Sequence, residues 1–492
     1  MAFELENDQL RVFFLPYFLA GHMIPMVDIA RLFAAHGGAD VTIVTTAANA
    51  ATFQNSIDRD TEAGHRIRTH LLPFPSSQLG LPDGVENKNV AVSAHMCSQI
   101  SQGIALLKEP MGQLLRQARP DCIVSDMFHP WTADVALELG IPRLVFDGSS
   151  YFQFCAASAA TVSGENDVVS LQGLPHKVEL LKSKIPDWSG FGSSFMEALA
   201  DSRKKSYGAI VNSFSELESD YEDHFRNKLG SKAWSLGPVS FWVNKDFSDK
   251  IERGNNKKKN NVNNQDLINW LDSKEENSVL YVSFGSLTRL PTTQLVEIAH
   301  GLEASGHQFI WVINEKETQE EEIDRSGALF LESFEERMKR NQKGLIIRKW
   351  APQLLILDHP AIGATVTHCG WNSILEAVTA GLPMVTWPLF AEQFYNEKLL
   401  TEVVRIGVGV GVERWSFDWW RVSEETAAAV GREKVEKAVR FVMSDEEEEA
   451  LEMRKRAKKL SVAAKMAVES GGSSWSNLVA LVDELKSLKI QP

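Results

Sequence analysis

The sequence predicts an α/β protein made of two doubly wound parallel sheets. At 492 residues the chain is too long for one ordinary hydrophobic core, which favours two domains of somewhat over two hundred residues each. In both halves, short apolar runs alternate with helical patterns, as they do in βα repeats. A polar, Asn-rich stretch at 246–265 separates the halves, and the alternation starts again after it.

The N-terminal half begins with an apolar run at 11–18 that predicts the first parallel strand. A helix is expected at 24–36, with Gly37 as its stop. His22 would therefore lie between the carboxyl end of a strand and a helix, where open α/β sheets place their ligands. Two long interruptions, at 73–84 and 148–205, are expected to shape a pocket. Further strands are expected at 40–46, 70–74, 121–126, 142–147 and 208–213.

The stretch at 246–265 has almost no apolar residues, which predicts an exposed, mobile linker. Its lysine cluster at 257–259 is interpreted as a solvated charge run. The glycines at 407, 409 and 411 lack the spacing of a dinucleotide loop, so we interpret them as part of a strand. For the rest of the second half, strands are expected at 278–284, 308–313, 344–347, 362–366 and 383–387, and helices at 292–305, 432–443, 446–466 and 474–488.

Composition and charge exclude several classes of function. The formal net charge of -14 argues against nucleic acid or an anionic membrane as a partner. The N-terminus lacks the apolar core of a signal peptide, and no apolar run reaches the length of a membrane helix. The four cysteines are widely spaced and show no metal-ligand pattern. We therefore expect a cytoplasmic protein without structural zinc or disulfides.

The stretch at 350–393 holds the residues that most clearly predict a binding site. A short buried strand leads through a turn with His368 into a helix opened by Asn372 and Ser373. Both are good N-cap residues, and Glu376 follows Ser373 at capping-box spacing. The first N–H groups of such a helix attract an anion. The histidine, amide and hydroxyl add donors that suit a diphosphate held without a metal.

Groups suited to a nucleoside and a sugar flank this turn. Upstream, Trp350 offers a flat face for a base, and Gln353 offers an amide that can hydrogen-bond to it. Downstream, Glu392 and Gln393 suit sugar hydroxyls. The stretch thus provides for base, ribose, diphosphate and sugar in one segment.

The same stretch resembles the plant secondary product glycosyltransferase box, the donor-binding signature of plant family-1 UDP-glycosyltransferases. The resemblance runs from the first Trp through HCGWNS to the terminal Gln. The alternative is that the tryptophans are core residues and the histidine is a satisfied buried side chain. Position by position, the resemblance implies donor contacts: Trp350 on uracil with Ala351 and Gln353 nearby, Glu376 on the ribose hydroxyls, His368, Asn372 and Ser373 on the diphosphate, and Trp371, Glu392 and Gln393 on the sugar.

The resemblance covers nearly the whole chain and implies the GT-B fold, in which two Rossmann-like domains face a cleft. It implies an acceptor-binding domain at 1–245, the linker at 246–265, a UDP-sugar-binding domain at 266–473 and a C-terminal helix at 474–492 that packs on the first domain. The expected partners are a UDP-sugar and a small hydrophobic acceptor. A monomer is expected, without nucleic acid and without membrane insertion.

Transfer of a sugar to an acceptor hydroxyl needs a base, and imidazole suits this role at cytosolic pH. His22 is the candidate base. Asp126 is the candidate partner for its second nitrogen, because it ends a strand at the same sheet edge. GHMIPM and VSDMF match the motifs in which the family carries this pair. A turn cap for His22 and a helix cap for Asp126 are the alternative explanations.

Stabilisation of the departing diphosphate is the second requirement. Ser286, on the turn after the first strand of the second half, is expected to add a hydroxyl to the helix start described above. A DxD-type carboxylate pair occurs as Asp58 and Asp60, but in the half without the box and in a polar segment interpreted as solvated. We therefore expect catalysis without metal or cofactor, with inversion at the anomeric carbon.

The donor sugar is predicted from the end of the box. Within the family, Gln at the last position goes most often with glucose and His with galactose, and this chain has Gln393. Trp371 also matches the glucose pattern, and no Arg stands at these positions to meet a glucuronate. Glu392 occupies a place where many relatives have Asp. UDP-glucose is therefore expected, with UDP-galactose, UDP-xylose and UDP-glucuronate as alternatives.

The acceptor is less specified by the sequence. The wording FAEQFYNEKL is similar to the family branch that acts on triterpenoids, steroids and flavonoids. This similarity implies a hydroxyl or carboxyl acceptor such as a triterpenoid saponin or flavonoid. Aromatic residues in the first half are expected to line an apolar pocket for it, although core packing is the alternative: Phe18, Phe128, His129, Phe152 and Phe154.

The sequence disfavours three alternatives: a non-catalytic nucleotide-sugar binder, a hydrolase or epimerase that uses the same nucleotide sugar, and a dinucleotide-dependent oxidoreductase. A non-catalytic nucleotide-sugar binder would keep the box and lose the base. A glycosidase needs two carboxylates that flank one bond, and the sequence presents no such pair. A dinucleotide-dependent oxidoreductase would begin one half with GxGxxG, and neither half does.

Overall fold

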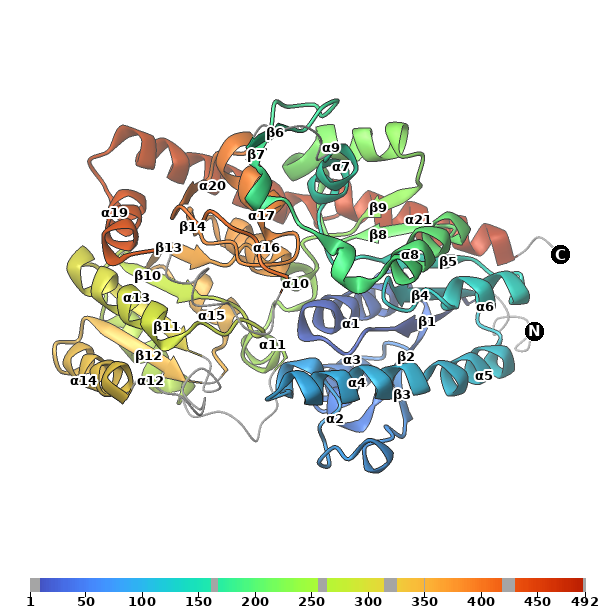
Figure 1. The fold of residues 1–492 in the computed structure, drawn as a ribbon. Coiled ribbons are helices and arrows are strands. Elements are labelled where there is room, and N and C mark those ends of the chain that lie inside the picture. Colours follow the sequence, from blue (N-terminus) through green and yellow to red (C-terminus); the bar gives the residue numbers. More distant parts are fainter. Residues whose placement is uncertain are drawn as a thin grey trace.

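The chain folds into two α/β lobes that lie side by side in the computed structural model (Figure 1). The structure describes residues 9–160, 167–254, 263–313, 325–348, 350–417 and 430–489. The lysine cluster at 257–259 lies outside these residues. Among the helices in these ranges, none is both long and apolar enough to cross a membrane.

The front lobe contains a seven-stranded parallel sheet in the order β3-β2-β1-β4-β5-β8-β9. Helices cover both faces, so the central strands β4 and β5 are buried along their whole length, whereas the edge strand β3 is partly exposed. The register places Val12 of β1 beside Val41 and Cys122 of the two neighbouring strands. The strands are β1 (Arg11–Leu15), β2 (Asp40–Thr46), β3 (Ile67–Leu72), β4 (Cys122–Asp126), β5 (Arg143–Phe146), β8 (Gly208–Val211) and β9 (Ala233–Ser235).

The helices of the front lobe follow the strands in βα order. A small antiparallel ribbon of β6 (Val168–Ser170) and β7 (Glu179–Leu181) lies within the long interruption after β5. The first helix starts at Ala20, so His22 lies inside its first turn rather than before it. The helices are α1 (Ala20–Ala35), α2 (Ala47–Ala50), α3 (Gln54–Glu62), α4 (Ala94–Leu106), α5 (Lys108–Ala118), α6 (Thr132–Leu139), α7 (Tyr151–Ala159), α8 (Ser193–Lys205), α9 (Ser215–Lys228) and α10 (Val239–Val243).

The rear lobe contains a six-stranded parallel sheet in the order β12-β11-β10-β13-β14-β15. Its strands are β10 (Val279–Ser283), β11 (Gln308–Ile313), β12 (Gly344–Arg348), β13 (Ile362–Thr367), β14 (Met384–Thr386) and β15 (Gly407–Gly409). Its helices are α12 (Asn264–Asp272), α13 (Thr292–Ser305), α14 (Arg325–Arg340), α15 (Gln353–Leu357), α16 (Trp371–Ala380), α17 (Gln393–Lys398), α19 (Arg432–Met443) and α20 (Glu448–Ala467). The two parallel sheets, each with helices on its faces, form a GT-B fold.

The C-terminal helix α21 (Ser473–Lys489) leaves the rear lobe and packs on the front lobe. In Figure 1, the red ribbon of α20 and α21 runs from one lobe to the other, and α21 lies along β9. Leu478, Leu481 and Leu485 are buried in the same core as Trp234 of β9. The Ser474 hydroxyl donates to the backbone oxygen of Gly237, which fixes the start of the helix.

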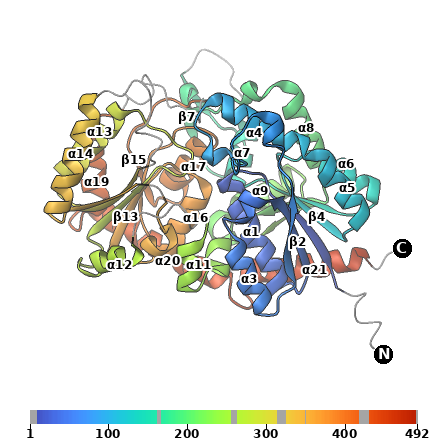
Figure 2. The same cartoon turned by 90° about the horizontal axis from the view of Figure 1, so that it is seen from below.

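Helix α11 (Phe247–Glu252) corrects the expectation that 246–265 is an exposed linker throughout. It lies between the two lobes in both views (Figures 1 and 2). Asp249 is buried and accepts hydrogen bonds from Arg31 at 3.3 Å and Arg59 at 2.5 Å. Because ion pairs to the front lobe hold the segment, it needs few apolar residues to dock. Arg31 also pairs with Asp60 at 2.6 Å, so Asp60 is not the solvated residue that the sequence suggested.

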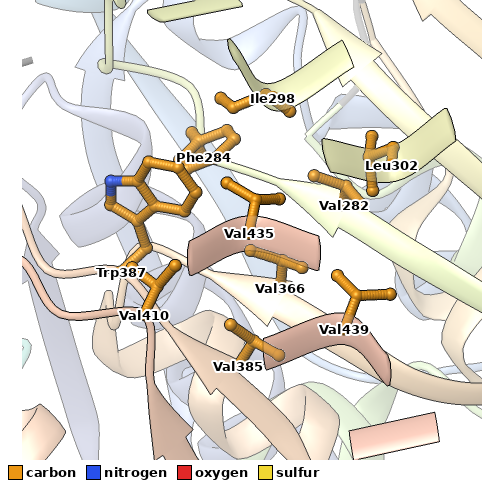
Figure 3. Close-up of a pocket in the computed structure, with 10 residues that line it drawn as sticks. All are labelled: Val282, Phe284, Ile298, Leu302, Val366, Val385, Trp387, Val410, Val435 and Val439. Carbon is orange, nitrogen blue, oxygen red and sulfur yellow. The ribbon is translucent and has the colours of Figure 1, made fainter. Parts of the chain in front are cut away.

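A small cavity lies in the core of the rear lobe, between its sheet and helices α13 and α19 (Figure 3). Every side chain around it is apolar, so it offers no group to orient a nucleotide. We interpret it as imperfect core packing, not as a binding site. Its lining is Val282, Phe284, Ile298, Leu302, Val366, Val385, Trp387, Val410, Val435 and Val439.

Candidate active site

His22 and Asp126 form a hydrogen-bonded pair at the carboxyl edge of the front sheet. His22 lies in the first turn of α1, and Asp126 is the last residue of β4. Since β1 and β4 are neighbours in the sheet, both residues come to the same edge. His22 Nδ1 is 2.7 Å from Asp126 Oδ2, and the carboxylate is fully buried while the imidazole keeps 18% of its surface exposed.

Asp126 is held in place by contacts on its other polar atoms. Its Oδ1 accepts a hydrogen bond from the backbone N–H of Phe128 at 2.9 Å. Its backbone oxygen accepts from the Arg143 guanidinium at 3.4 Å. The carboxylate therefore has a fixed orientation toward His22, as an orienting partner of a base requires.

The electrostatics of the pair favour a basic imidazole. Burial lowers the pKa of His22, but the charge and hydrogen bond of Asp126 outweigh burial and raise that pKa above its usual value. The carboxylates of Glu392 and Asp147 act in the same direction. In the neutral ring, Nδ1–H donates to Asp126, which leaves Nε2 as the proton acceptor.

The turn before α16 forms an anion site in the rear lobe. The helix begins at Trp371 with Gly370 as its N-cap and no side-chain cap, so the expected capping box does not form. The first helical hydrogen bond runs from Ile374 to Gly370, which leaves the earlier N–H groups without a partner inside the helix. These groups and the helix dipole favour a phosphate at this point.

His368 lies against this turn as a neutral imidazole, because burial lowers its pKa to about 4. Its Nδ1 is buried and has no hydrogen-bond partner within the protein. Glycines make room for the ring: a Cβ on Gly370 would lie 2.4 Å from it, and one on Gly285 would lie 2.6 Å from it. Gly285 also has a φ of +78°, which disfavours any other residue there.

Hydrogen bonds join the front lobe to the start of α16 and to Ser286 on the turn after β10. Asn372 Nδ2 donates to the backbone oxygen of Gly21, next to His22, at 2.7 Å. The Trp371 indole donates to the backbone oxygen of Asn212 at 2.7 Å. Asn89 of the front lobe donates to the Ser286 hydroxyl at 2.8 Å. The structure therefore brings the candidate base and the candidate diphosphate site together.

The residues assigned to the nucleoside also cluster. Gln353 Nε2 is 2.6 Å from Glu376 Oε2 and 3.3 Å from the Ser373 hydroxyl. The Tyr281 hydroxyl donates to Gln353 Oε1 at 3.0 Å. Trp350 precedes the buried Ala351, and its indole nitrogen has no hydrogen-bond partner.

The three residues assigned to the sugar, Glu392, Gln393 and Trp371, differ in the contacts that they make. The Glu392 carboxylate lies close enough to His22 to raise the pKa of the imidazole, and burial raises the pKa of Glu392 itself. Gln393 is buried, and its Oε1 accepts from the backbone N–H groups of Leu389 and Phe390 at 2.9 and 3.0 Å, so only its amide nitrogen is left for a sugar. The Trp371 side chain is 2% exposed and engaged between the lobes, which differs from the expected sugar contact of its ring.

Of the aromatic residues expected to line an acceptor pocket, Phe128 lies beside the base, with its ring centroid 5.2 Å from that of His22. Phe18 and Phe152 are fully buried in hydrophobic cores, so the expectation is wrong for them. His129 is also buried, and burial lowers its pKa. Phe154 packs on Phe225 and under the Arg203 guanidinium.

Sequence reasoning missed the aromatic residues that do gather around Phe128. The ring centroid of Tyr17 lies 4.9 Å from that of Phe128, and the Phe195 ring stacks on Phe128 with the centroids 6.2 Å apart. The group continues through residues of both lobes, which contact one another ring to ring: Trp188, Phe191, Trp415 and Phe417. The aromatic content of 148–205 was the available signal, but it did not say which rings face the cleft.

Comparison with known proteins identifies the family. A model of the family described as UDP-glucoronosyl and UDP-glucosyl transferase matches residues 84–416, which is more than half of the chain. The chain belongs to this family. It is a UDP-dependent glycosyltransferase.

Relatives of this glycosyltransferase match along almost their whole length. A soyasapogenol B glucuronide galactosyltransferase from Glycine max is 48% identical, over 99% of this chain and 98% of that one. A UDP-glucose flavonoid 3-O-glucosyltransferase 7 from Fragaria ananassa is 46% identical, over 99% of both chains. The crystal structure of Glycyrrhiza uralensis UGT73P12 with glycyrrhetinic acid 3-O-monoglucuronide has a TM-score of 0.91 and 49% identity, and the match covers 98% of this chain and 97% of that one.

Proposed function

We propose that this glycosyltransferase moves a hexose, glucose in the first place, from a UDP-sugar to a hydroxyl of a hydrophobic plant metabolite of the triterpenoid saponin or flavonoid class. The observation that carries the proposal is the junction of the two lobes. There, Asn372 of the donor turn contacts Gly21, the neighbour of His22, while His22 is paired with Asp126 at 2.7 Å.

In the proposed reaction His22 Nε2 takes the proton of the acceptor hydroxyl. The acceptor oxygen forms a bond to the anomeric carbon as the bond from that carbon to the β-phosphate oxygen breaks, and UDP leaves with the electron pair. Attack on the side opposite UDP inverts the configuration, so an α-linked donor gives a β-glycoside. Asp126 stabilises the imidazolium as it forms.

The departing diphosphate is stabilised by groups that are already oriented. The N–H groups at the start of α16 and the neutral imidazole of His368 are the main ones, and the hydroxyl of Ser286 and the amide of Asn372 are close by. Preorganised donors of this kind supply the electrostatic stabilisation that a metal supplies in other transferases. We therefore propose that the reaction is independent of metal ions, with Ser373 and the Trp350–Gln353 segment binding the rest of UDP.

The acceptor class is supported by the aromatic rings around His22. Phe128, Tyr17 and Phe195 form an apolar wall beside the base. A flat polycyclic acceptor gains contact area on such a wall without needing many polar partners. Among the relatives, one is named for a soyasapogenol glucuronide and one for a flavonoid, which supports acceptors of these two kinds.

Glucose is the first choice of sugar because Gln393 ends the box. UDP-galactose is a second candidate, because the Glycine max relative is named as a galactosyltransferase. We further propose that the enzyme works as a monomer in the cytosol, where its four free cysteines, all buried, would stay reduced.

The proposal is tested by incubating the purified enzyme with equal concentrations of UDP-glucose, UDP-galactose, UDP-xylose and UDP-glucuronate and a panel of triterpenoid and flavonoid acceptors. Mass spectrometry of the products identifies the sugar and the acceptor together. We expect an added hexose on a triterpenoid or flavonoid, at an unchanged rate in the presence of a chelator. Binding of UDP without any product would support a non-catalytic binder instead. A rate that falls on chelation and returns with a divalent cation would remove the metal-independent mechanism.

A further inference from the structure

We propose that Arg253, which directly follows α11, is a positioning residue that orients the ribose-binding carboxylate of Glu376 and ties it to α1, the helix that carries the base. This inference rests on the proposed function, because it assigns a role within the UDP site. It concerns a residue outside the donor-binding box, on a segment that the sequence indicated to be an exposed linker.

The contacts of Arg253 reach both lobes at once. Its Nη1 donates to Glu376 Oε1 at 2.6 Å, and its Nε donates to Asp28 Oδ2 at 2.9 Å. Asp28 belongs to α1 of the front lobe, and Glu376 belongs to α16 of the rear lobe. The side chains are well buried, with exposures of 12% for Arg253 and 4% for each carboxylate.

Because Arg253, Asp28 and Glu376 are buried, each of these charges depends on its partners. Burial disfavours the charged guanidinium, but Asp28 and Glu376 outweigh it and raise the pKa of Arg253. Buried carboxylates in turn need partners, because an unpaired buried charge is costly. Asp28 has Asn244 as a second partner at 3.2 Å, and Glu376 has Gln353 at 2.6 Å. Arg253 is thus the cation that Asp28 and Glu376 share.

These partners fix how Glu376 can meet a ribose. Arg253 occupies one lone pair of Oε1 and Gln353 one of Oε2, while an ionised carboxylate accepts about four hydrogen bonds. The remaining lone pairs are therefore held in a defined plane for the two ribose hydroxyls. The guanidinium keeps that plane constant because it is planar and permanently charged.

The neighbouring Gly254 provides a second contact with the nucleoside end of the site. It has a φ of +71°, and a Cβ there would lie 2.8 Å from the Trp350 ring and 2.6 Å from Ile24 of α1. The Arg253–Gly254 segment thus lies against the residue assigned to uracil as well as the one assigned to ribose. Figure 2 shows α11, α1 and α16 grouped at the junction of the lobes.

The contact of Arg253 with Asp28 links the ribose site to α1, the helix that carries His22. Asp28 lies six residues after His22 on the same helix, or about 9 Å along its axis at about 1.5 Å per residue. Because Asp28 and His22 belong to the same helix, a ribose that orders Glu376 and Arg253 also restrains the element that carries the base. Donor binding and placement of the base are thereby coupled through a single arginine.

The experiment compares the affinities for UDP and 2′-deoxy-UDP by titration calorimetry, because 2′-deoxy-UDP lacks the 2′-hydroxyl, one of the two ribose hydroxyls that Glu376 would meet. For the wild-type enzyme we expect UDP to bind about tenfold or more tightly than 2′-deoxy-UDP. Arg253→Met should weaken UDP binding by about tenfold to a hundredfold and should remove most of that preference. A general loss of folding would weaken both ligands alike, so the preference separates the two explanations.

A matched control comes from the same helix. Lys250 forms another ion pair from α11 to the rear lobe, with Asp358 at 2.6 Å, but it does not contact Glu376. Lys250→Met should keep the UDP preference. Arg253→Lys serves if the methionine variant does not fold: a single ammonium cannot reproduce the fork on both carboxylates, so the preference should fall. Asp28→Asn should reduce it by less than Arg253→Met does.

The possible results separate the proposals. A folded Arg253→Met or Arg253→Lys variant with the full wild-type preference would overturn the role of Arg253, although transfer by the wild-type enzyme would still support the proposed function. An unchanged preference in Asp28→Asn would overturn the bridge to α1. Wild-type enzyme that binds no UDP would overturn the proposed function, and this inference with it.

Discussion

Asp126→Asn is the substitution that best separates the role of the His22–Asp126 pair in catalysis from a role in folding. Asparagine has the same shape, and its oxygen can still accept from the Phe128 N–H. It removes the charge that faces His22 Nδ1 at 2.7 Å from a fully buried position. The loss is therefore electrostatic, with little change in packing.

The size of the effect follows from the kind of hydrogen bond that is lost. A hydrogen bond to a charged group contributes about 1.5 to 3 kcal/mol. This corresponds to about one to two pKa units and to about 10- to 150-fold in rate. With the carboxylate gone, the burial that lowers the pKa of His22 is no longer outweighed. The pKa of His22 should then fall by this amount.

The assay is the pH profile of kcat/KM for glycosyl transfer. The base works only when His22 is unprotonated, so the rate falls as the pH drops through its pKa. In Asp126→Asn the plateau should be about 10- to 150-fold lower, and the acidic limb should move to lower pH by about one to two units. Asp121→Asn, one residue before β4 at the opposite end of the strand, should leave the limb in place.

A limb that stays at the wild-type pH, or moves to higher pH, would contradict the pairing of His22 with Asp126. An unmoved limb together with a uniform loss of rate and a lowered thermal midpoint of unfolding would indicate a folding defect instead. The thermal midpoint of unfolding should be measured for both variants, because it distinguishes these two results.

Three further predictions follow from the site and the core. Phe128→Ala should raise the acceptor KM without changing the Kd of UDP, because the centroid of its ring lies 5.2 Å from that of His22. Phe18 is buried in the core, so Phe18→Ala should instead lower the free energy of unfolding by about 3 to 5 kcal/mol. Gln393→Glu keeps the oxygen that accepts from Leu389 and Phe390 but loses the amide donor, so kcat/KM for UDP-glucose should fall about tenfold or more. Burial raises the pKa of Glu218 to about 7, so this group stabilises the fold below its unfolded pKa and loses that effect as the pH rises through 7. The thermal midpoint of unfolding of Glu218→Gln should therefore vary less between pH 5 and pH 8 than that of the wild type. An acceptor KM unchanged in Phe128→Ala, a full rate in Gln393→Glu, or a wild-type pH dependence in Glu218→Gln would each contradict the corresponding assignment.

Much of the fold was predictable because parallel strands are buried on both faces. Apolar runs such as VFFL at 12–15 mark them directly, and the structure has a strand at Arg11–Leu15. The same property limits the prediction of pockets. Phe18 and Phe128 both follow strands, yet one is in the core and the other is beside His22. Nothing in the local pattern distinguishes them, since both sides of the sheet are apolar.

The docking of α11 and the contacts of Arg253 were not predictable from local sequence. Asp249 is buried through Arg31, which lies 218 positions earlier in the chain, and Arg253 reaches Asp28 and Glu376 from a stretch with almost no apolar residues. Low apolar content indicates disorder only when no partner compensates the charges. At α16, the expected cap was replaced by Gly370, because Asn372 is engaged by the front lobe and Glu376 by Gln353 and Arg253.

The role of His22 as the base is best tested by its removal. His22→Ala and the wild-type enzyme should be compared for transfer from UDP-glucose and, by calorimetry, for the Kd of UDP. If His22 Nε2 takes the acceptor proton, transfer falls by about 10² to 10⁴ while the Kd of UDP stays the same. Transfer at close to the wild-type rate in His22→Ala would show that another group removes the proton.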